Sequence, residues 1–385
     1  MPKIEVLTFS TLFPNNIQKN HGIFVENRLR HLLSTGEVGA TVLAPVPWGR
    51  VRGIARHEDR DGLAIHHPRY PAIPRLGMSV APSLLYHSSL RAIRSLDLRF
   101  DLIDAHYAYP DGVAAVRLGK KLGKPVVITA RGSDITQLPD YAAPRRQIIA
   151  ALKDAHALIG VSAALCVRMV ELGADPQKVI TLRNGVDTQI FRPLSRAAAR
   201  DALGLTRPTL LSVGLLIERK GHDRTIAAMS SLPDHELIIL GEGPERSRLE
   251  RQIATLGLQN RVRLLGARPH ADLPAFYSAA DAMVLSSSRE GWANVLLESM
   301  ACGTPVIASN IPGNSEVVQE PVAGLVVADN TPAGIVAGVR KLFATPADRS
   351  ATRAYAERFS WDATSAGQLA IFRRVMDSRR LSMAC

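Results

Sequence analysis

Short apolar runs alternate with amphipathic stretches along almost the whole chain. The runs are rich in Val, Ile and Leu, whereas apolar residues in the stretches between them recur every three or four positions. Buried strands of a parallel sheet produce the first pattern, and helices that cover such a sheet produce the second. The sequence therefore predicts an α/β protein with helices on both faces of parallel sheets.

The apolar runs form two series, each of which suffices for a doubly wound domain. The first consists of residues 3–9, 40–45, 101–105, 125–130, 157–161 and 178–182, and the second of residues 209–214, 236–240, 261–265, 282–286, 304–308 and 323–327. Between them, NGVDTQIFRPLS (184–195) contains Asn-Gly and Arg-Pro and has no long periodic face. We expect a first Rossmann-like domain at 1–185, a linker at 186–204 and a second Rossmann-like domain at 205–357.

The segment 358–385 contains a long amphipathic run at 362–378, which Ser360 or Asp362 could cap. No strand follows this predicted helix, so its apolar face must be buried against structure that is already formed. We expect the helix to pack back on the first domain.

The composition is that of a folded protein, with 385 residues of which 46% are hydrophobic and 21% charged. No apolar run approaches the roughly 20 residues that cross a bilayer, and MPKIEVLTFS at the start lacks the pattern of a signal peptide. The three cysteines, Cys166, Cys302 and Cys385, are too widely spaced for a disulfide framework or a CxxC metal site. We expect a cytoplasmic protein.

The net charge of +12 is concentrated in the first half, where residues 1–185 hold 24 Lys and Arg against 15 Asp and Glu. Such an excess suits nucleic acid, an anionic membrane or a phosphorylated substrate, although scattered arginines also simply solvate a surface. Loops 46–60 and 69–80 mix arginines with apolar side chains, namely Trp48, Ile54, Tyr70, Ile73 and Met78. We therefore expect peripheral contact with the anionic inner face of the plasma membrane.

The segment SSSREGWANVLLESMACGTPVIAS (286–309) is the richest in chemistry. Glu290 and Glu298 are eight positions apart, which along a helix corresponds to about 12 Å. At that distance the two carboxylates cannot share a proton or a metal ion, so they would hold different parts of an extended ligand.

Between the two glutamates the sequence predicts the start of a helix. Gly291 is followed by Ala293, Asn294 and Val295, whose backbone N–H groups at a helix N-terminus suit a phosphate. An anion with a hydroxyl acceptor on either side matches a sugar–diphosphate–ribose.

Together with Gly303-Thr304-Pro305-Val306, this segment resembles the signature of retaining GT-B glycosyltransferases of family 4 (glycosyl transferases group 1). The resemblance implies that Glu290 accepts hydrogen bonds from the donor sugar and Glu298 from the ribose. It also implies two Rossmann-like domains that face a cleft, and retention of configuration at the anomeric carbon.

Weaker matches to the family extend over most of the chain. GEGPERSRL (241–249) resembles its glycine turn, in which Gly241 and Gly243 would let the backbone approach the nucleotide. FPNNIQKNHGIFVENRLRHL (13–32) resembles the loop after the first strand, where Gly22 would allow close approach to the donor phosphates or the acceptor. NGVDTQIFRP resembles the interdomain linker.

The chain departs from the family at the cations that bind the donor diphosphate. In SVGLLIERKGHD (212–223), members usually carry an arginine directly after the residue equivalent to Gly214 and a lysine before the later glycine. Here Lys220 stands at the lysine position, but Leu215 occupies the arginine position. Arg219 is the candidate replacement for this arginine. The alternative is that Arg219 is only a solvated surface residue.

A second departure is TARGSD (129–134), where Arg131 stands in place of a histidine that many members place near the reacting sugar. A guanidinium cannot act as a base near neutral pH, but it can stabilise negative charge on a leaving phosphate. Asp134 would orient Arg131, contact the acceptor or simply form a turn. His106, at the end of the preceding strand, is either an acceptor contact or a structural residue.

We interpret the chain as a hexosyltransferase-type enzyme that uses a nucleotide-diphosphate sugar and a saccharide or polyprenyl-linked acceptor, in the synthesis of a cell-surface polysaccharide or glycolipid. Neither an Asp-x-Asp after a strand nor a metal-ligand cluster is present in the sequence, so we expect no metal and no cofactor. A sugar-nucleotide epimerase of the same architecture is the alternative. A nucleic-acid-binding protein is less favoured, since aromatic residues make up only 5%. The donor base, the sugar and the acceptor stay open.

Overall fold

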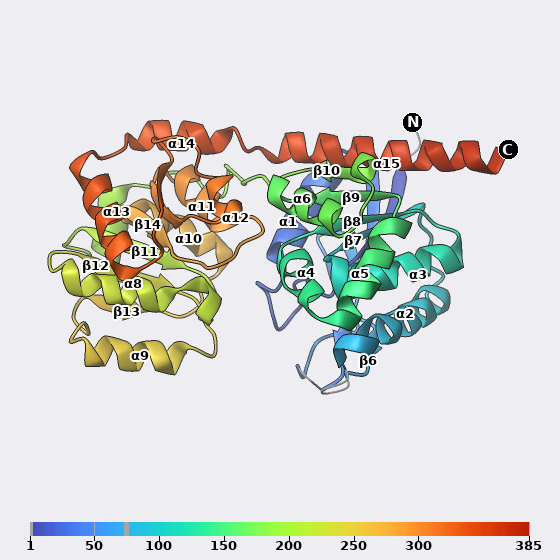
Figure 1. Cartoon of the computed structure of the whole chain (residues 1–385), viewed down its shortest axis with the longest axis horizontal. Helices are drawn as coiled ribbons and strands as arrows, with labels where there is room; N and C mark the ends of the chain where they lie inside the picture. Colours follow the sequence, from blue (N-terminus) through green and yellow to red (C-terminus); the bar gives the residue numbers. More distant parts are fainter. Residues whose placement is uncertain (1–2, 50, 73–76, 385) are drawn as a thin grey trace. The chain divides into compact units, whose positions relative to one another are not determined.

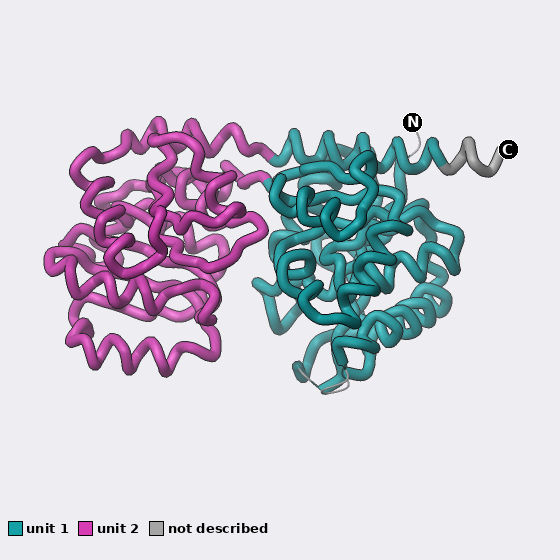
Figure 2. Tube along the Cα trace, viewed as in Figure 1, with its two compact units in different colours: residues 1–184, 361–385 teal, residues 185–360 magenta. Residues whose placement is uncertain are grey.

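The computed structural model describes residues 3–49, 51–72 and 77–384, and it divides into two compact units (Figures 1 and 2). Unit 1 comprises the chain up to Asn184 together with the segment that begins at Trp361, and unit 2 comprises Gly185–Ser360. The chain thus passes from unit 1 to unit 2 and back again.

Unit 1 contains an eight-stranded sheet of order β10-β9-β8-β7-β1-β2-β5-β4, in which every neighbouring pair is parallel except β4 and β5. Its strands are β1 (Ile4–Phe9), β2 (Val38–Leu43), β4 (His57–Arg60), β5 (Leu63–His66), β7 (Leu102–His106), β8 (Val126–Ala130), β9 (Ala157–Gly160) and β10 (Val179–Thr181). A separate pair joins β3 (Val46–Pro47) to β6 (Arg69–Tyr70). The six predicted strands of this half are confirmed, but β3 to β6 lie in segments that we had expected to be loops or had left unassigned.

The helices of unit 1 form two groups. Helices α2 (Gly77–Ser95), α3 (Val113–Leu122) and α5 (Ala142–Asp154) pack against one another, whereas α1 (Ile23–Leu33) packs against the C-terminal helix α15 (Trp361–Ala384). Two smaller helices, α4 (Ser133–Thr136) and α6 (Ala163–Glu171), follow β8 and β9.

Helix α15 completes the core of unit 1, as predicted (Figure 1). Its side chains Leu369, Ile371, Phe372 and Val375 are buried in one cluster with strand residues such as Val6 of β1. The Gln368 amide also donates a 2.7 Å hydrogen bond to Asp104 in β7. Both apolar packing and a buried polar contact therefore hold this helix on the sheet.

Unit 2 contains a six-stranded parallel sheet of order β13-β12-β11-β14-β15-β16. Its strands are β11 (Thr209–Val213), β12 (Glu236–Leu240), β13 (Val262–Leu264), β14 (Ala282–Leu285), β15 (Val306–Ser309) and β16 (Gly324–Val327). Its helices are α7 (Arg196–Leu203), α8 (His222–Ala228), α9 (Arg246–Thr255), α10 (Leu273–Ala279), α11 (Asn294–Ala301), α12 (Pro312–Ser315), α13 (Pro332–Ala344) and α14 (Arg349–Glu357). All six predicted strands of the second series are present.

Residues 186–204, which we expected to form a linker, belong to unit 2. Phe191 is 1% exposed, and Arg353 of α14 donates hydrogen bonds to the carbonyls of Phe191 and Thr188. The Asn-Gly and Arg-Pro signals do mark an irregular segment, but a buried aromatic ring and an arginine fix it on the unit that follows.

Among the described residues, no helix is both long and apolar enough to span a membrane, and no group of three or more His, Cys, Asp or Glu side chains could hold a metal ion.

We predict that Phe372→Ala lowers the opening free energy of the β1 and β7 core by about 3–5 kcal/mol, because it leaves a cavity under α15. Hydrogen–deuterium exchange mass spectrometry measures this in unit 1 peptides, while unit 2 peptides serve as an internal reference. Arg374→Ala, an exposed change on the same helix, should alter the same peptides by less than about 0.5 kcal/mol. Equal effects of the two variants would contradict the packing role of α15.

Candidate functional site

The predicted donor-side residues Lys220, Arg219 and Glu290 come together in unit 2. The first two follow β11 and Glu290 follows β14, which is the parallel neighbour of β11. The Lys220 ammonium donates a 2.6 Å hydrogen bond to Glu290 Oε1, and an Arg219 guanidinium nitrogen lies 3.4 Å from Glu290 Oε2. Arg219 also donates a 2.7 Å bond to the Arg289 carbonyl. Three of the four residues predicted as catalytic thus form one ion-paired cluster.

The Glu290 carboxylate is stabilised as an anion although only 9% of its side chain is exposed. Burial by itself raises the pKa of this carboxyl, but the charges of Lys220 and Arg219 outweigh burial and hold the pKa of Glu290 below its ordinary value. The Ser287 hydroxyl adds a 2.7 Å hydrogen bond to Oε1. Ser287 was not predicted, because one serine in SSSREG looks like any other loop serine.

Leu215, at the position where the family usually has arginine, is 60% exposed. Its carbonyl is held by the buried His222, whose Nε2 lies 3.2 Å away, while His222 Nδ1 lies 3.1 Å from the Ser212 hydroxyl. Burial lowers the pKa of His222 to about 4, so the ring is neutral at physiological pH. The loop after β11 is therefore held by the buried His222. Within this loop, Arg219 is the arginine that lies beside Lys220.

Gly241 and Gly243 were predicted to let the backbone approach the nucleotide, but in the structure they lie close to another loop of the protein. A Cβ on Gly241, whose φ is +154°, would lie 1.8 Å from the Gly214 carbonyl oxygen, and one on Gly243 would lie 2.4 Å from that of Leu216. These glycines let the loops after β11 and β12 pack on each other. Gly214, with φ +156°, faces the methylene chain of Lys220.

Helix α11 begins at Asn294, so Glu290 and the buried Gly291 lie in the loop before it. The 12 Å helical spacing between the two glutamates therefore does not apply, because only Glu298 is on the helix. Ala293 precedes the first turn without a side-chain cap, and Asn294 and Val295 open the helix as predicted.

Glu298 is separately held by two aromatic side chains. The Tyr277 hydroxyl donates a 2.9 Å hydrogen bond to Oε2, and His270 Nε2 lies 3.3 Å from Oε1. Neither partner was predicted, since both lie upstream of the glutamate segment.

In unit 1, Arg131 follows β8, and its guanidinium makes hydrogen bonds with two side chains. One guanidinium nitrogen lies 2.6 Å from His106 Nδ1, and another donates a 3.0 Å hydrogen bond to Asn184. His106 Nε2 lies 3.2 Å from Asp104. Burial lowers the pKa of His106 to about 4, although Asp104 opposes this shift, so the neutral ring accepts from Arg131 and donates to Asp104. His106 is 1% exposed, which favours the structural alternative.

Asp134 organises the turn after β8. Its carboxylate accepts hydrogen bonds from the backbone N–H groups of Ala108 and Gly132, both at 2.7 Å, and of Arg131 at 3.1 Å. The side chain is fully buried. Of the three roles left open, the geometry favours the turn, through which Asp134 also places the backbone of Arg131.

The fully buried Arg28 of α1 was not predicted. Its guanidinium donates to Gln368 at 2.6 Å, to the Leu182 carbonyl at 3.2 Å and to Asn184 at 3.3 Å. Asn184 thus accepts hydrogen bonds from both Arg28 and Arg131. Arginine in an amphipathic helix normally faces solvent, so only the tertiary structure could show that this one is internal.

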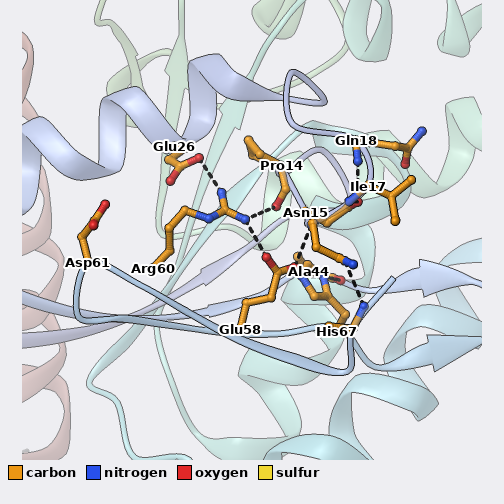
Figure 3. Close-up of polar contacts among 12 residues, drawn as sticks. Pro14, Asn15, Ile17, Gln18, Glu26, Ala44, Glu58, Arg60, Asp61 and His67 are labelled. Carbon is orange, nitrogen blue, oxygen red and sulfur yellow. Dashed lines mark hydrogen bonds and ion pairs between the residues drawn. The ribbon is translucent and has the colours of Figure 1, made fainter. Parts of the chain in front are cut away.

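The loop between β1 and α1 is held by a polar network on the β4–β5 hairpin (Figure 3). Glu58 accepts hydrogen bonds from the Asn16 backbone N–H at 3.1 Å, from His67 at 2.9 Å and from Arg60 at 2.9 Å. Arg60 also reaches Glu26 at 2.9 Å. Burial raises the pKa of Glu58, but Arg60, Asn16 and His67 outweigh burial and hold it below its ordinary value.

Gly22, at the end of this loop, has φ +70° and precedes α1. A Cβ there would lie 2.4 Å from the backbone of Leu12. The close approach that requires glycine is thus between two parts of the same loop.

Two family models match adjoining parts of the chain. The model described as Glycosyltransferase Family 4 matches residues 38–190, and the model described as Glycosyl transferases group 1 matches residues 196–359. Both descriptions name sugar transfer, which favours this activity over the epimerase and nucleic-acid alternatives.

Two relatives carry the same kind of name. The chain is 36% identical over 217 residues to the D-inositol 3-phosphate glycosyltransferase of Segniliparus rotundus, a match that covers 53% of this chain and about half (48%) of the relative. It is 29% identical over 350 residues to the D-inositol 3-phosphate glycosyltransferase 1 of Catenulispora acidiphila, with 83% of each chain covered.

The solved structure of HepE from Anabaena in complex with UDP is similar throughout, with a TM-score of 0.75 at 20% identity, over 97% of this chain and all of that chain. At this level of identity the likeness shows the fold. It confirms the predicted GT-B class with two Rossmann-like domains.

We predict that Glu58→Gln loosens the loop between β1 and α1. The glutamine amide has one acceptor oxygen for the three donors that Glu58 binds, and its NH₂ group would lie against one of those donors. Charged hydrogen bonds contribute about 1.5–3 kcal/mol, so amide exchange in peptide 13–22 should accelerate by roughly tenfold to a hundredfold. Acidification should do the same to the wild type, since a carboxylate with a lowered pKa loses its stabilising charge only as the pH falls through that pKa.

The control is Asp61→Asn on the same hairpin, whose carboxylate is 83% exposed and pairs only with Arg30 in the described contacts. Unchanged exchange in Glu58→Gln, or an equal increase in Asp61→Asn, would contradict the anchoring role of Glu58.

Proposed function

Because the chain belongs to the family 4 glycosyltransferases (glycosyl transferases group 1), we propose that it transfers a sugar, with retention at the anomeric carbon, from a nucleoside diphosphate sugar to a saccharide or lipid-linked acceptor. The cluster of Lys220, Arg219 and Glu290 carries this proposal. It lies at the carboxyl ends of parallel strands, where α/β sheets bind ligands.

The charges of this cluster support a donor diphosphate held without a metal ion. A nucleoside diphosphate sugar brings negative charge, which grows on the leaving phosphate as the glycosidic bond breaks. Lys220 and Arg219 are already fixed beside each other by Glu290, so they offset that charge without reorganising. Glu290 in turn has an ionised oxygen available for the sugar hydroxyls.

The remaining roles follow from the same chemistry. Glu298 accepts hydrogen bonds from the ribose, and the N-terminus of α11 faces the diphosphate. The leaving phosphate helps to deprotonate the acceptor hydroxyl on the same face of the sugar, which gives retention without a carboxylate nucleophile. Within unit 1, Arg131 is a positive charge that the neutral His106 and Asn184 hold in place, and it keeps its expected role of stabilising negative charge as a proposal.

The names of similar proteins guide the choice of donor and of biosynthetic role. The named relatives are D-inositol 3-phosphate glycosyltransferases, and the HepE structure contains UDP. We therefore propose UDP sugars as the first donors to test, and a role in the synthesis of a cell-surface polysaccharide or glycolipid.

The first test measures thermal stabilisation by UDP, GDP and ADP. The matching diphosphate at 100 times its Kd should stabilise the wild type by about 2.7 kcal/mol. Lys220→Ala should lose most of this stabilisation, and its kcat should fall by about 10²–10³ once a donor is known. Lys341→Ala, on the exposed surface of α13, is the matched control. A Lys220→Ala enzyme with unaltered affinity and kinetics would overturn the donor site.

We predict that Arg219→Ala lowers kcat nearly as much as Lys220→Ala does. Arg219 lies beside Lys220 and takes the place of the arginine that family members usually carry at the position of Leu215. Leu215→Arg in the Arg219→Ala background should recover part of the kcat. If Arg219 were only a surface arginine, its removal would cost less than about 1 kcal/mol of transition-state stabilisation. Steady-state kinetics on the single and double variants separates these outcomes.

We also propose that unit 1 binds an anionic membrane surface peripherally. Trp48 and Met78 are 62% and 45% exposed, whereas Ile54 is buried and cannot contribute as we had expected. Ile73 lies outside the described residues. The +9 excess of the first half would supply the electrostatic attraction.

Co-sedimentation with anionic and neutral vesicles tests this. We expect binding to anionic vesicles that weakens with salt and that Trp48→Ser reduces. Tyr141→Ser, which removes another exposed aromatic of unit 1, should have no effect. Absence of any preference for anionic vesicles at low salt would contradict the proposal.

A further inference from the structure

Both oxygens of the Glu298 carboxylate are held by side chains to which the proposed donor site assigns no role. Tyr277 of α10 donates to Oε2 at 2.9 Å, and His270, in the turn before α10, lies with its Nε2 3.3 Å from Oε1. Only 12% of the Glu298 side chain is exposed, against 20% of that of His270. The carboxylate therefore has one fixed orientation.

The hydrogen-bond roles follow from the donors available. An ionised carboxylate carries no proton, so the Tyr277 hydroxyl must be the donor. Burial and the adjacent Glu298 charge raise the pKa of Tyr277 well above its ordinary value, which keeps that proton in place. His270 must likewise present an Nε2–H to Oε1.

This arrangement leaves a specific set of free acceptors. A carboxylate has about four lone-pair positions, two on each oxygen. Tyr277 occupies one position on Oε2 and His270 one on Oε1, so each oxygen keeps one. Two adjacent acceptors on neighbouring oxygens match the two hydroxyls of a vicinal diol, such as the 2′ and 3′ hydroxyls of a ribose.

The two aromatic partners are themselves packed on the segment that enters unit 2. The ring of Phe191 contacts His270 edge to face, with centroids 4.8 Å apart, and lies 6.0 Å from the ring of Tyr277. Arg353 fixes the backbone of Phe191 and also donates to the Ala301 carbonyl at the end of α11. The two side chains that hold Glu298 are thus themselves packed against Phe191, whose backbone Arg353 holds in place.

We propose that Tyr277 and His270 are positioning residues that aim the Glu298 carboxylate at the ribose diol of the nucleoside diphosphate, so that recognition of the diol depends on both. This inference rests on the proposed function, because it assigns the ligand of Glu298. The charge state of His270 makes the recognition depend on pH.

The sign of that dependence follows from the groups around the ring. Burial by itself lowers the pKa of His270, but the hydrogen bond and charge of Glu298 on α11, aided by Asp187 on the entering segment, outweigh burial and raise it. The charged ring is therefore fully present below pH 6.5, and its charge is lost as the pH rises through the raised pKa. Affinity for the diol should fall over the same range.

The experiment compares two ligands by calorimetry, namely the diphosphate selected among UDP, GDP and ADP by thermal shift, and its 2′,3′-dideoxy analogue. The wild type should prefer the ribose form. Tyr277→Phe and His270→Asn should each reduce this preference by about three- to tenfold, which is typical of one hydrogen bond, with little change in affinity for the dideoxy form. In His270→Asn the preference should also lose its pH dependence above pH 6.5, whereas ionisation of the ligand phosphate is the same in every variant.

Unit 2 offers matched controls. Tyr355→Phe removes a buried hydroxyl that donates to the Val317 carbonyl at 2.8 Å. His235→Asn removes a ring that contacts Phe343 edge to face at 4.9 Å, as His270 contacts Phe191. Both controls should keep the wild-type preference for ribose even if they lower stability.

A measurement without nucleotide tests the contact itself. The pKa of His270, followed by NMR, should drop in Glu298→Gln. Wild-type diol preference in both Tyr277→Phe and His270→Asn, or an unchanged His270 pKa in Glu298→Gln, would overturn the inference while leaving the proposed function in place. If the wild type binds none of the three diphosphates, or binds the ribose and dideoxy forms equally, the assignment of Glu298 to the ribose fails, and the inference fails with it.

Discussion

A charge that is removed from water must be paired or hydrogen-bonded, since the desolvation of an isolated ion costs several kcal/mol. This constraint accounts for the placement of the functional side chains in both units. The Glu290 carboxylate, only 9% exposed, pairs with Lys220 and Arg219, while the half-buried Arg131 is hydrogen-bonded to His106 and Asn184. In each case the partners that make burial tolerable also fix the charged group in one orientation, which is the preorganisation that electrostatic catalysis requires.

The loops that carry these groups are shaped by contacts with one another as much as by any ligand. Gly22, Gly241 and Gly243 are required by contacts inside the protein, because a Cβ on each would lie 2.4 Å or less from the backbone of a neighbouring stretch. The motif glycines are therefore first a requirement for the native loop structure. A ligand would meet loops whose conformation is already set.

The sequence predicted the strands that are buried on both faces, since these are continuous apolar runs. It missed β4, whose residues His57–Arg60 are all polar, because an edge strand gains its place from pairing with β5 rather than from burial. In the site, the resemblance to a family singled out Glu290 and Lys220, which the structure places in direct contact. It could not predict Ser287, Tyr277 or Arg28, because the role of each depends on a neighbour that only the tertiary structure supplies.

The division of unit 1 into two separate stretches of chain has a consequence for the order of synthesis. Unit 2 is formed by the continuous stretch Gly185–Ser360, so all of its strands leave the ribosome before α15 does. Until residues 361–378 have been made, the face of the first sheet around Val6 and Leu102 lacks the apolar cover that Leu369 and Phe372 provide. The unit that begins first is therefore completed last, and the nascent chain must carry an uncovered hydrophobic surface through the whole translation of unit 2, during which a chaperone would have a binding site that the finished protein hides.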